Sequence, residues 1–123
     1  TTQESALMER VQDLSGDEVM TLPKFVSLDV LAAVLNRAAL VVANSTGPLH
    51  VASAVGTPVI GLYPFMRTCH PRRWGPLGVA DVFTPAPQPG CARCAAEDGD
   101  EHDDMKRIAV PEVLAAALRR LDS

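Results

Sequence analysis

Apolar residues recur at a spacing of three or four in three stretches of the chain, and this spacing predicts amphipathic helices. The stretches are residues 4–14, 28–39 and 112–121. Pro111 suits the start of the last helix, and Ser27 is a good N-cap for the second. The apolar stripes are Leu7, Val11 and Leu14 in the first helix, Val30, Leu31, Val34, Leu35 and Ala38 in the second, and an Ala- and Leu-rich face in the third.

Continuous apolar runs between these stretches predict strands that are covered on both faces. Residues 40–43 form one such run, and residues 57–63 form another. A helix over residues 49–55, with Pro48 at its first position, would join them into the strand–helix–strand unit of a parallel sheet. Two shorter strands are expected as well, at residues 19–22 and 79–83. The predicted fold class is therefore α/β, a parallel sheet flanked by helices.

The composition narrows the classes of protein to which the chain can belong. It has 123 residues, of which 47% are hydrophobic and only 4% aromatic, so we expect one domain with a core of Ala, Val and Leu. No apolar run reaches the roughly 18 residues that a membrane span needs. Six of the 15 carboxylates fall within residues 97–104, which reads as a solvated loop. The rest of the chain is too weakly basic to predict a nucleic-acid surface.

The start of the chain and its cysteines bear on its origin and redox state. The opening is polar, without an initiator Met or a signal peptide, so we expect a piece of a longer protein. Three cysteines do not make a secreted disulfide framework, and a reducing cytoplasm is expected. Cys91 and Cys94, with His102 and Asp104, could bind zinc, but a second close Cys or His pair is missing. We expect free thiols, with a disulfide or a structural metal as the alternatives.

The turn Asn-Ser-Thr-Gly-Pro, residues 44–48, joins a predicted parallel strand to a helix. Ligands of open α/β sheets bind at the carboxyl ends of the strands, where the first N–H groups of the helix point outward beside the positive end of its dipole. Thr46 adds a hydroxyl, Gly47 permits close approach to the backbone, and His50 follows one turn later. A diphosphate suits these groups. The alternative is that the turn only caps the helix and His50 only packs.

Residues 44–58 closely resemble the signature of glycosyltransferase family 9, the ADP-heptose:lipopolysaccharide heptosyltransferases. The family signature reads roughly Asn-Asp-Thr-Gly-Pro-Met-His, then Ala-Ala and Gly-Thr-Pro, and the chain has Ser45 in place of the Asp. The resemblance extends from about residue 20 to the end. It includes a Ser-Leu…Leu-Ala-Ala-Val-Leu helix from residue 27, an Arg-Trp-Gly-Pro-Leu-Gly loop from residue 73, and the Cys-x-x-Cys, His-x-x-Met and Pro-Glu-Val-Leu of the tail.

The resemblance implies a GT-B architecture, in which two Rossmann-like domains face each other across a cleft. Residues 1–123 match a single, partial C-terminal domain that binds the nucleotide sugar, and the N-terminal domain with the acceptor site and the catalytic base is absent. The implied reaction is inverting transfer of heptose or a related sugar, from an ADP-heptose-like donor to the lipopolysaccharide core, with no cofactor or metal. The implied location is the cytoplasm, at the inner face of the inner membrane, with peripheral membrane association of the full-length protein. The fragment alone is expected to be inactive.

Several side chains are candidates for the nucleotide-sugar site. Lys24, just after a predicted strand end, is a candidate for lining the pocket. Arg67, Arg72 and Arg73 lie with His70 in a loop after another strand and could bind phosphate, the alternative being a solvated or domain-contacting loop. The residues of the signature turn complete the set: Asn44, Ser45, Thr46, Gly47, Pro48 and His50.

Two other functions stay open. One is a non-catalytic module that binds nucleotide sugars, for which Ser45 is the main indication. The other is the C-terminal domain of a different GT-B enzyme, such as a sugar-nucleotide epimerase.

Overall fold

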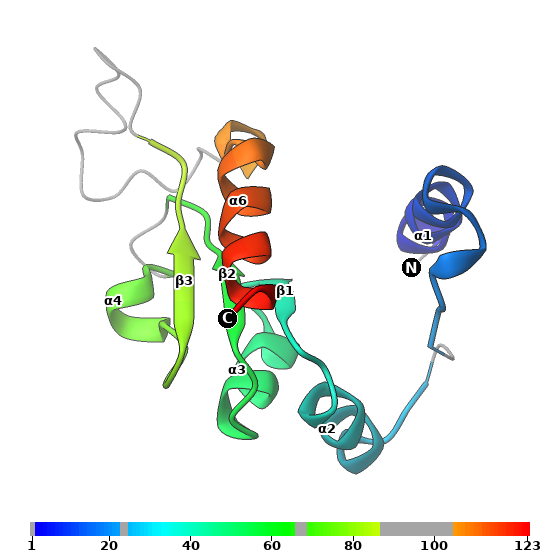
Figure 1. Ribbon diagram of the computed structural model, residues 1–123, viewed down its shortest axis with the longest axis horizontal. Helices are drawn as coiled ribbons and strands as arrows, with labels where there is room; N and C mark the ends of the chain where they lie inside the picture. Colours follow the sequence, from blue (N-terminus) through cyan, green and yellow to red (C-terminus); the bar gives the residue numbers. More distant parts are fainter. Residues whose placement is uncertain (1, 23–24, 66–68, 87–104) are drawn as a thin grey trace.

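The computed structural model describes residues 2–22, 25–65, 69–86 and 105–123. Within these ranges the chain has an α/β fold, a parallel three-stranded sheet with helices on both faces (Figure 1). The predicted fold class is confirmed. None of the helices in the described ranges is long and apolar enough to cross a membrane.

Three short strands form the sheet, and their order in space follows their order in the sequence. β1 (Val41–Asn44) pairs in parallel with β2 (Val59–Leu62), and β2 pairs in parallel with β3 (Ala80–Phe83). The register places Val41 opposite Val59. Because the strands are parallel, their carboxyl ends meet at one edge, and the turn after β1 and the loop after β2 lie together there.

The helix α3 (Gly47–Ala54) joins β1 to β2 and covers one face of the sheet. Leu49 and Ala52 of this helix pack with Val59 and Tyr63, and all four side chains are fully buried. This small aliphatic cluster around one aromatic ring is the core of the fold, as the Ala- and Val-rich composition predicts.

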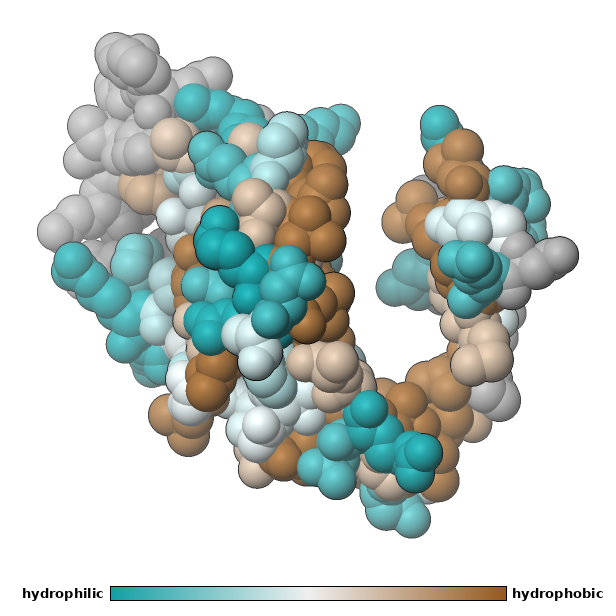
Figure 2. Space-filling view, viewed as in Figure 1, coloured by the Kyte–Doolittle hydropathy of each residue, from teal (hydrophilic) through white to brown (hydrophobic). Residues whose placement is uncertain are grey.

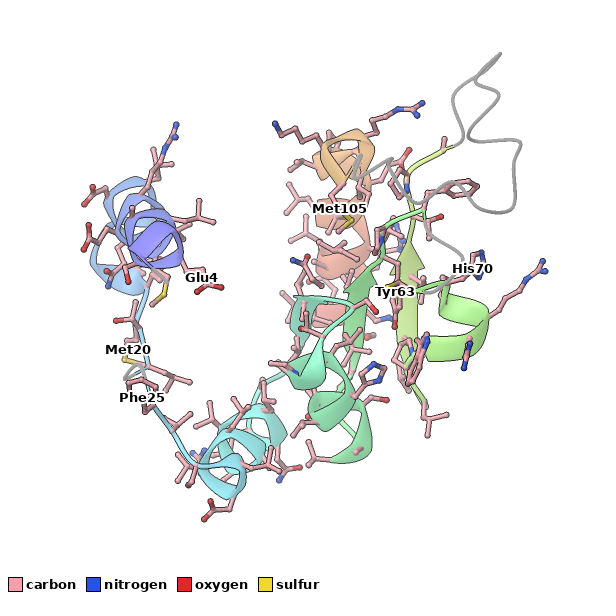
Figure 3. All side chains as sticks on the ribbon, turned by 180° about the vertical axis from the view of Figure 1, so that it is seen from behind. Glu4, Met20, Phe25, Tyr63, His70 and Met105 are labelled. Carbon is pink, nitrogen blue, oxygen red and sulfur yellow. The ribbon has the colours of Figure 1, made fainter. Side chains whose placement is uncertain are left out.

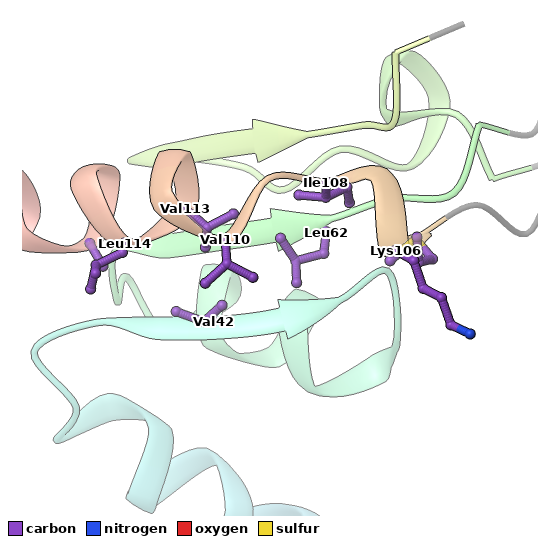
Figure 4. Close-up of a pocket in the computed structure, with 9 residues that line it drawn as sticks. Val42, Leu62, Lys106, Ile108, Val110, Val113 and Leu114 are labelled. Atoms are coloured by element: carbon purple, nitrogen blue, oxygen red, sulfur yellow. The ribbon is translucent and has the colours of Figure 1, made fainter. Parts of the chain in front are cut away.

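The last helix, α6 (Val110–Leu121), covers the opposite face. Side chains alternate along a strand, so Val42 and Leu62 point away from the α3 core and toward α6 (Figure 4). The Arg120 Nε donates a hydrogen bond to the Asp81 Oδ2 at 2.7 Å, which ties α6 to β3. An apolar groove of about 470 Å³ runs along this face, lined by Val42, Leu62, Met105, Lys106, Ile108, Val110, Val113, Leu114 and Ala117.

The N-terminal helix α1 (Thr2–Ser15) stands apart from the sheet (Figure 1). A short 3-10 turn, η1 (Gly16–Glu18), follows it, and α2 (Leu28–Asn36) then leads into β1. The Thr57 hydroxyl donates to the Leu35 carbonyl at 2.8 Å and so anchors α2 to the start of β2. Apolar surface lies on both sides of the hollow between α1 and the sheet (Figure 2).

Two expectations about secondary structure are wrong. Residues 19–22 form no strand, because a strand needs a neighbour for its backbone hydrogen bonds and the described residues supply none beside this segment. The helix expected over residues 28–39 ends at Asn36. There the Arg37 N–H bonds to the Val34 carbonyl and the Ala38 N–H to the Leu35 carbonyl, and this tightening of the last turn directs the chain into β1.

Candidate functional site

The turn after β1 is fixed by its own backbone. The Ser45 N–H bonds to the Leu62 carbonyl at 2.9 Å, which extends the β1–β2 ladder by one residue. The Thr46 N–H and hydroxyl both donate to the Asn44 carbonyl, at 2.7 and 3.2 Å. Three hydrogen-bond donors of the turn therefore already have acceptors within the protein.

The start of α3 leaves one backbone donor available. Thr46 is the N-cap, with an extended backbone and no capping bond from its side chain. Pro48, at the second helical position rather than the first, has no N–H, and the Leu49 N–H bonds to the Thr46 carbonyl at 3.1 Å. Among the described residues no turn or strand carbonyl accepts from the Gly47 N–H. The space beside the Gly47 Cα is open, with no heavy atom within 4 Å of where a Cβ would lie.

His50 lies on the first turn of α3, three residues after Gly47, and its side chain is partly buried. Asn44, Thr46, Gly47 and Pro48 are exposed, and Ser45 is partly buried. The structure thus brings the residues of the signature turn together at the carboxyl end of β1. This helix start is exposed, and not all of its backbone N–H groups have acceptors. Such a helix start favours an anionic ligand.

Tyr63 is a residue of this region that the sequence analysis did not single out. It follows β2 directly, its N–H bonds to the Phe83 carbonyl at 2.9 Å, and its ring is fully buried. Its hydroxyl, on the side chain labelled in Figure 3, donates to the Trp74 carbonyl at 2.7 Å. Burial raises the pKa of Tyr63 above its ordinary value, and hydrogen bonding by the Ser45 side chain partly offsets that rise. The only available signal in the sequence was a tyrosine placed directly after a buried strand.

The loop after β2 carries two of the predicted phosphate ligands. It contains a four-residue helix, α4 (Pro71–Trp74), which begins after His70. The His70 Nδ1 accepts from the Arg72 N–H at 3.1 Å, and the Arg73 guanidinium lies 5.6 Å from the centre of the Trp74 ring. Arg72 and Arg73 are exposed. The bond from Tyr63 to Trp74 brings the backbone of α4 to the carboxyl end of β2.

A basic side chain from the C-terminal part of the chain also approaches this edge of the sheet. The 3-10 turn η2 (Met105–Arg107) lies beyond the carboxyl ends of β1 and β2, and Lys106 lines the groove there with Leu62 (Figure 4). Lys106 is exposed. No sequence pattern singles out Lys106, because it lies far from the signature turn along the chain.

The remaining candidates lie outside the described residues. They are Lys24, Arg67, Cys91, Cys94, His102 and Asp104. Within the ranges that the structure does describe, no three His, Cys, Asp or Glu side chains are grouped as a metal site.

Comparison with known proteins yields three matches. A family model described as glycosyltransferase family 9 (heptosyltransferase) matches residues 1–102. A protein of Haemophilus influenzae named "Putative glycosyltransferase" is 52% identical over 76 residues, which are 62% of this chain and 20% of that protein. The crystal structure of the glycosyl transferase family 9 from Veillonella parvula is similar with a TM-score of 0.64 and 28% identity, over 93% of this chain and 33% of that one. The chain therefore spans no more than a third of either relative.

Proposed function

The chain belongs to glycosyltransferase family 9, and from this premise we propose that the turn of residues 44–47 and the start of α3 bind the diphosphate of a nucleotide-sugar donor. The observation that carries the proposal is Gly47, at the start of a helix and at the carboxyl end of a parallel strand: no turn or strand carbonyl among the described residues accepts from its N–H, and the space beside its Cα is open. Thr46 and His50 flank this donor.

The proposed role in the reaction is stabilisation of the leaving group. As the sugar departs, negative charge accumulates on the nucleotide diphosphate, and N–H donors at a helix start together with basic side chains stabilise it. We propose that Arg72 and Arg73 supply such side chains, with Lys24 and Arg67 as further candidates. Asn44, Ser45 and Pro48 complete the wall of the site.

The finer assignment is heptose, or a related sugar, transferred with inversion from an ADP-heptose-like donor to the lipopolysaccharide core. The name of the family model supports it, and so does the resemblance of residues 44–58 to the heptosyltransferase signature. In this assignment residues 1–123 are part of the C-terminal donor-binding domain, and an N-terminal domain of the full-length protein contributes the acceptor site and the base. The full-length enzyme would work in the cytoplasm, at the inner face of the inner membrane.

Titration of the ¹⁵N-labelled chain with ADP tests the proposal. The amides that shift should cluster at residues 44–50, and Gly47→Val should abolish the shifts while the fold is kept, because the new side chain enters open space that the phosphate would need. Ala54→Val, at the other end of α3, is a matched control that should bind as the wild type does. Thr46→Val should change binding little, because the Thr46 hydroxyl already donates to the Asn44 carbonyl at 3.2 Å. Shifts that cluster away from this turn would refute the assignment.

One observation favours a second candidate, a non-catalytic module that binds nucleotide sugars. Ser45 stands in place of the family's Asp, so the turn lacks the carboxylate of the signature at this position. Turnover of ADP-heptose by the full-length protein, lost in a Gly47→Val variant, would decide in favour of the transferase. Binding of ADP-heptose without turnover would decide in favour of the module.

A further inference from the structure

The outer edge of β1 carries backbone groups that are open to a further strand. The N–H groups of Val41 and Ser45 bond to carbonyls on the β2 side, at 3.0 and 2.9 Å. Successive residues of a strand direct their backbone groups to opposite edges, so the backbone groups of Val42 and Asn44 face away from β2. In the part of the chain that the structure describes, β1 pairs with no strand other than β2. The edge therefore offers the N–H and carbonyl of Val42 and the N–H of Asn44.

The same edge is apolar on the face that α6 covers. Val42 is 49% exposed, and it lines the apolar groove together with Val110 and Leu114 of α6, which are 76% and 56% exposed. Parallel strands that lie between two layers of helices have apolar side chains on both faces. A strand added beside β1 would cover Val42 and would pack against the exposed side of α6.

The handedness of the chain places a further strand at this edge. α3 joins β1 to β2 over one face of the sheet, and Leu35 of α2 packs against the core on that same face. Right-handed crossovers over one face carry the chain across a sheet in one direction. Because β2 lies on one side of β1, the segment before α2 belongs on the other side, beyond the free edge. Residues 19–22, which have the composition of a strand, lie there (Figure 1).

Residues 19–22 do not themselves pair with β1. Met20 and Phe25 are each 93% exposed, and they lie across the hollow from the sheet (Figures 2 and 3). The space between this segment and β1 has apolar surface on both sides and an open backbone edge on one, and together these fit a β-strand. The chain spans no more than a third of either relative, so most of a protein of that length lies outside it.

We propose that the rest of the full-length protein contributes at least one parallel β-strand, which pairs with the outer edge of β1 and separates it from residues 19–22. The inference does not depend on the proposed function, because it uses only the edge, the groove and the direction of the crossovers. It has a consequence for the site, however. Parallel strands end at the same edge of a sheet, so the loop after the added strand would lie beside the turn of residues 44–47.

Hydrogen exchange of the β1 amides, in the 123-residue chain and in the full-length protein, tests the inference. The amides of Ala43 and Ser45 face β2 and are the internal control, so they should be protected in both proteins. The Val42 amide should exchange freely in the dilute chain and at least about tenfold more slowly in the full-length monomer, the effect of one hydrogen bond. Equal rates for Val42 in the two proteins would overturn the inference. Protection of Val42 already in the dilute chain would assign the edge to residues 19–22, and protection of the full-length protein only at high concentration would assign it to a second copy; either result overturns it as well.

Val42→Pro separates strand pairing from simple burial of β1. Proline has no N–H and is tolerated at a free sheet edge, so the midpoint of thermal unfolding of the 123-residue chain should change little. In the full-length protein the midpoint should fall at least about 3 °C further than in Val42→Ala, which shortens the side chain but keeps the N–H. A fall that is no larger for proline than for alanine, or that is the same in both proteins, would show that no strand pairs with this edge. ADP binding by the 123-residue chain is a separate measurement, and its failure would refute the proposed function while leaving this inference intact.

Discussion

At the scale of single residues, the packing of Gly61 against Tyr63 gives the carboxyl end of β2 its shape. Gly61 is buried in the middle of the sheet, and a Cβ at this position would lie 2.7 Å from the Tyr63 Cε2 and 3.2 Å from the Leu49 Cδ2. Both of those side chains are fully buried and have little room to move. The absence of a side chain at Gly61 thus leaves room for the Tyr63 ring.

Gly61→Ala should therefore destabilise the fold by roughly 1–3 kcal/mol, the usual cost of overpacking a close-packed core. Chemical denaturation followed by circular dichroism measures this change in the free energy of unfolding. Gly47→Ala is the matched control and should cost nothing, since no atom lies within 4 Å of the added Cβ. Equal stability of Gly61→Ala and the wild type would show that the Tyr63 ring adjusts freely.

The buried hydroxyl of Tyr63 also makes the stability depend on alkaline pH. Burial raises the pKa of Tyr63 in the folded protein above 10.0, whereas in the unfolded chain it has its ordinary value. The stabilisation is complete below about pH 10 and is lost as the pH rises toward the folded pKa, because the unfolded state releases its proton first. We expect the urea midpoint to fall between pH 9 and pH 11. In Tyr63→Phe this part of the decline should disappear.

At the scale of elements, side-chain hydrogen bonds link three of the helices to the sheet and its loops. Thr57 bonds to the C-terminal part of α2, the Ser53 hydroxyl of α3 donates to the Leu77 carbonyl, and Arg120 of α6 pairs with Asp81 of β3. Val42 of β1 and Leu62 of β2 line the apolar groove together with residues of α6. The ion pair of Arg120 links the C-terminal half of α6 to β3.

Asp81→Asn should lower the free energy of unfolding only modestly, because the two side chains are 31% and 32% exposed and water screens the pair. The loss should be smaller in high salt, because dissolved ions screen the pair further. The pair raises the pKa of Arg120, so the arginine keeps its charge at all pH values of interest. Denaturant midpoints at low and high ionic strength measure the effect, and the neighbouring exposed Arg119→Gln is the control. A larger loss in Arg119→Gln than in Asp81→Asn would contradict this account of how α6 is held.

At the scale of the whole molecule, a large amount of apolar surface is exposed. Met20 and Phe25 are each 93% exposed, and α1 turns Leu7 and Leu14 toward solvent. On the other side of the hollow, the groove between α6 and β1 is open, and β1 pairs with no strand other than β2 among the described residues (Figure 2). Surfaces of this kind promote association.

We expect the isolated chain to self-associate as its concentration rises. Analytical ultracentrifugation should show this, and Met20→Ser combined with Phe25→Ser should weaken it. Leu77→Ser removes a side chain that is 79% exposed, from a loop elsewhere on the molecule, and should have little effect. A strictly monomeric wild-type chain at high concentration would contradict the prediction.

The proposed division of labour between two domains also has a consequence at this scale. The purified 123-residue chain should show no transferase activity with ADP-heptose, because the base and the acceptor site would belong to the N-terminal domain. A coupled assay for released ADP measures this, with the full-length protein as the positive control. Turnover by the chain alone would contradict the proposed assignment of the base.

The order strand, turn, helix, strand was determined by the sequence alone. The apolar runs at residues 40–43 and 57–63 and the turn between them are local patterns, and local spacing suffices to predict local structure. The signature turn was found at the carboxyl end of β1 for the same reason. The spacing of residues could not show that the Gly47 N–H is the donor left available. Its availability depends on which other donors of the turn already have acceptors in the folded protein.

The tertiary structure decided everything that depends on partners distant in the sequence. Residues 19–22 have the composition of a strand but no neighbour to pair with, so they are not one. Tyr63 reads in the sequence only as the end of an apolar run, yet its hydroxyl donates to the Trp74 carbonyl, 11 positions later in the chain. Hydrogen bonds between strands and between buried side chains form only after the chain has folded, and the sequence pattern of one segment carries no record of them.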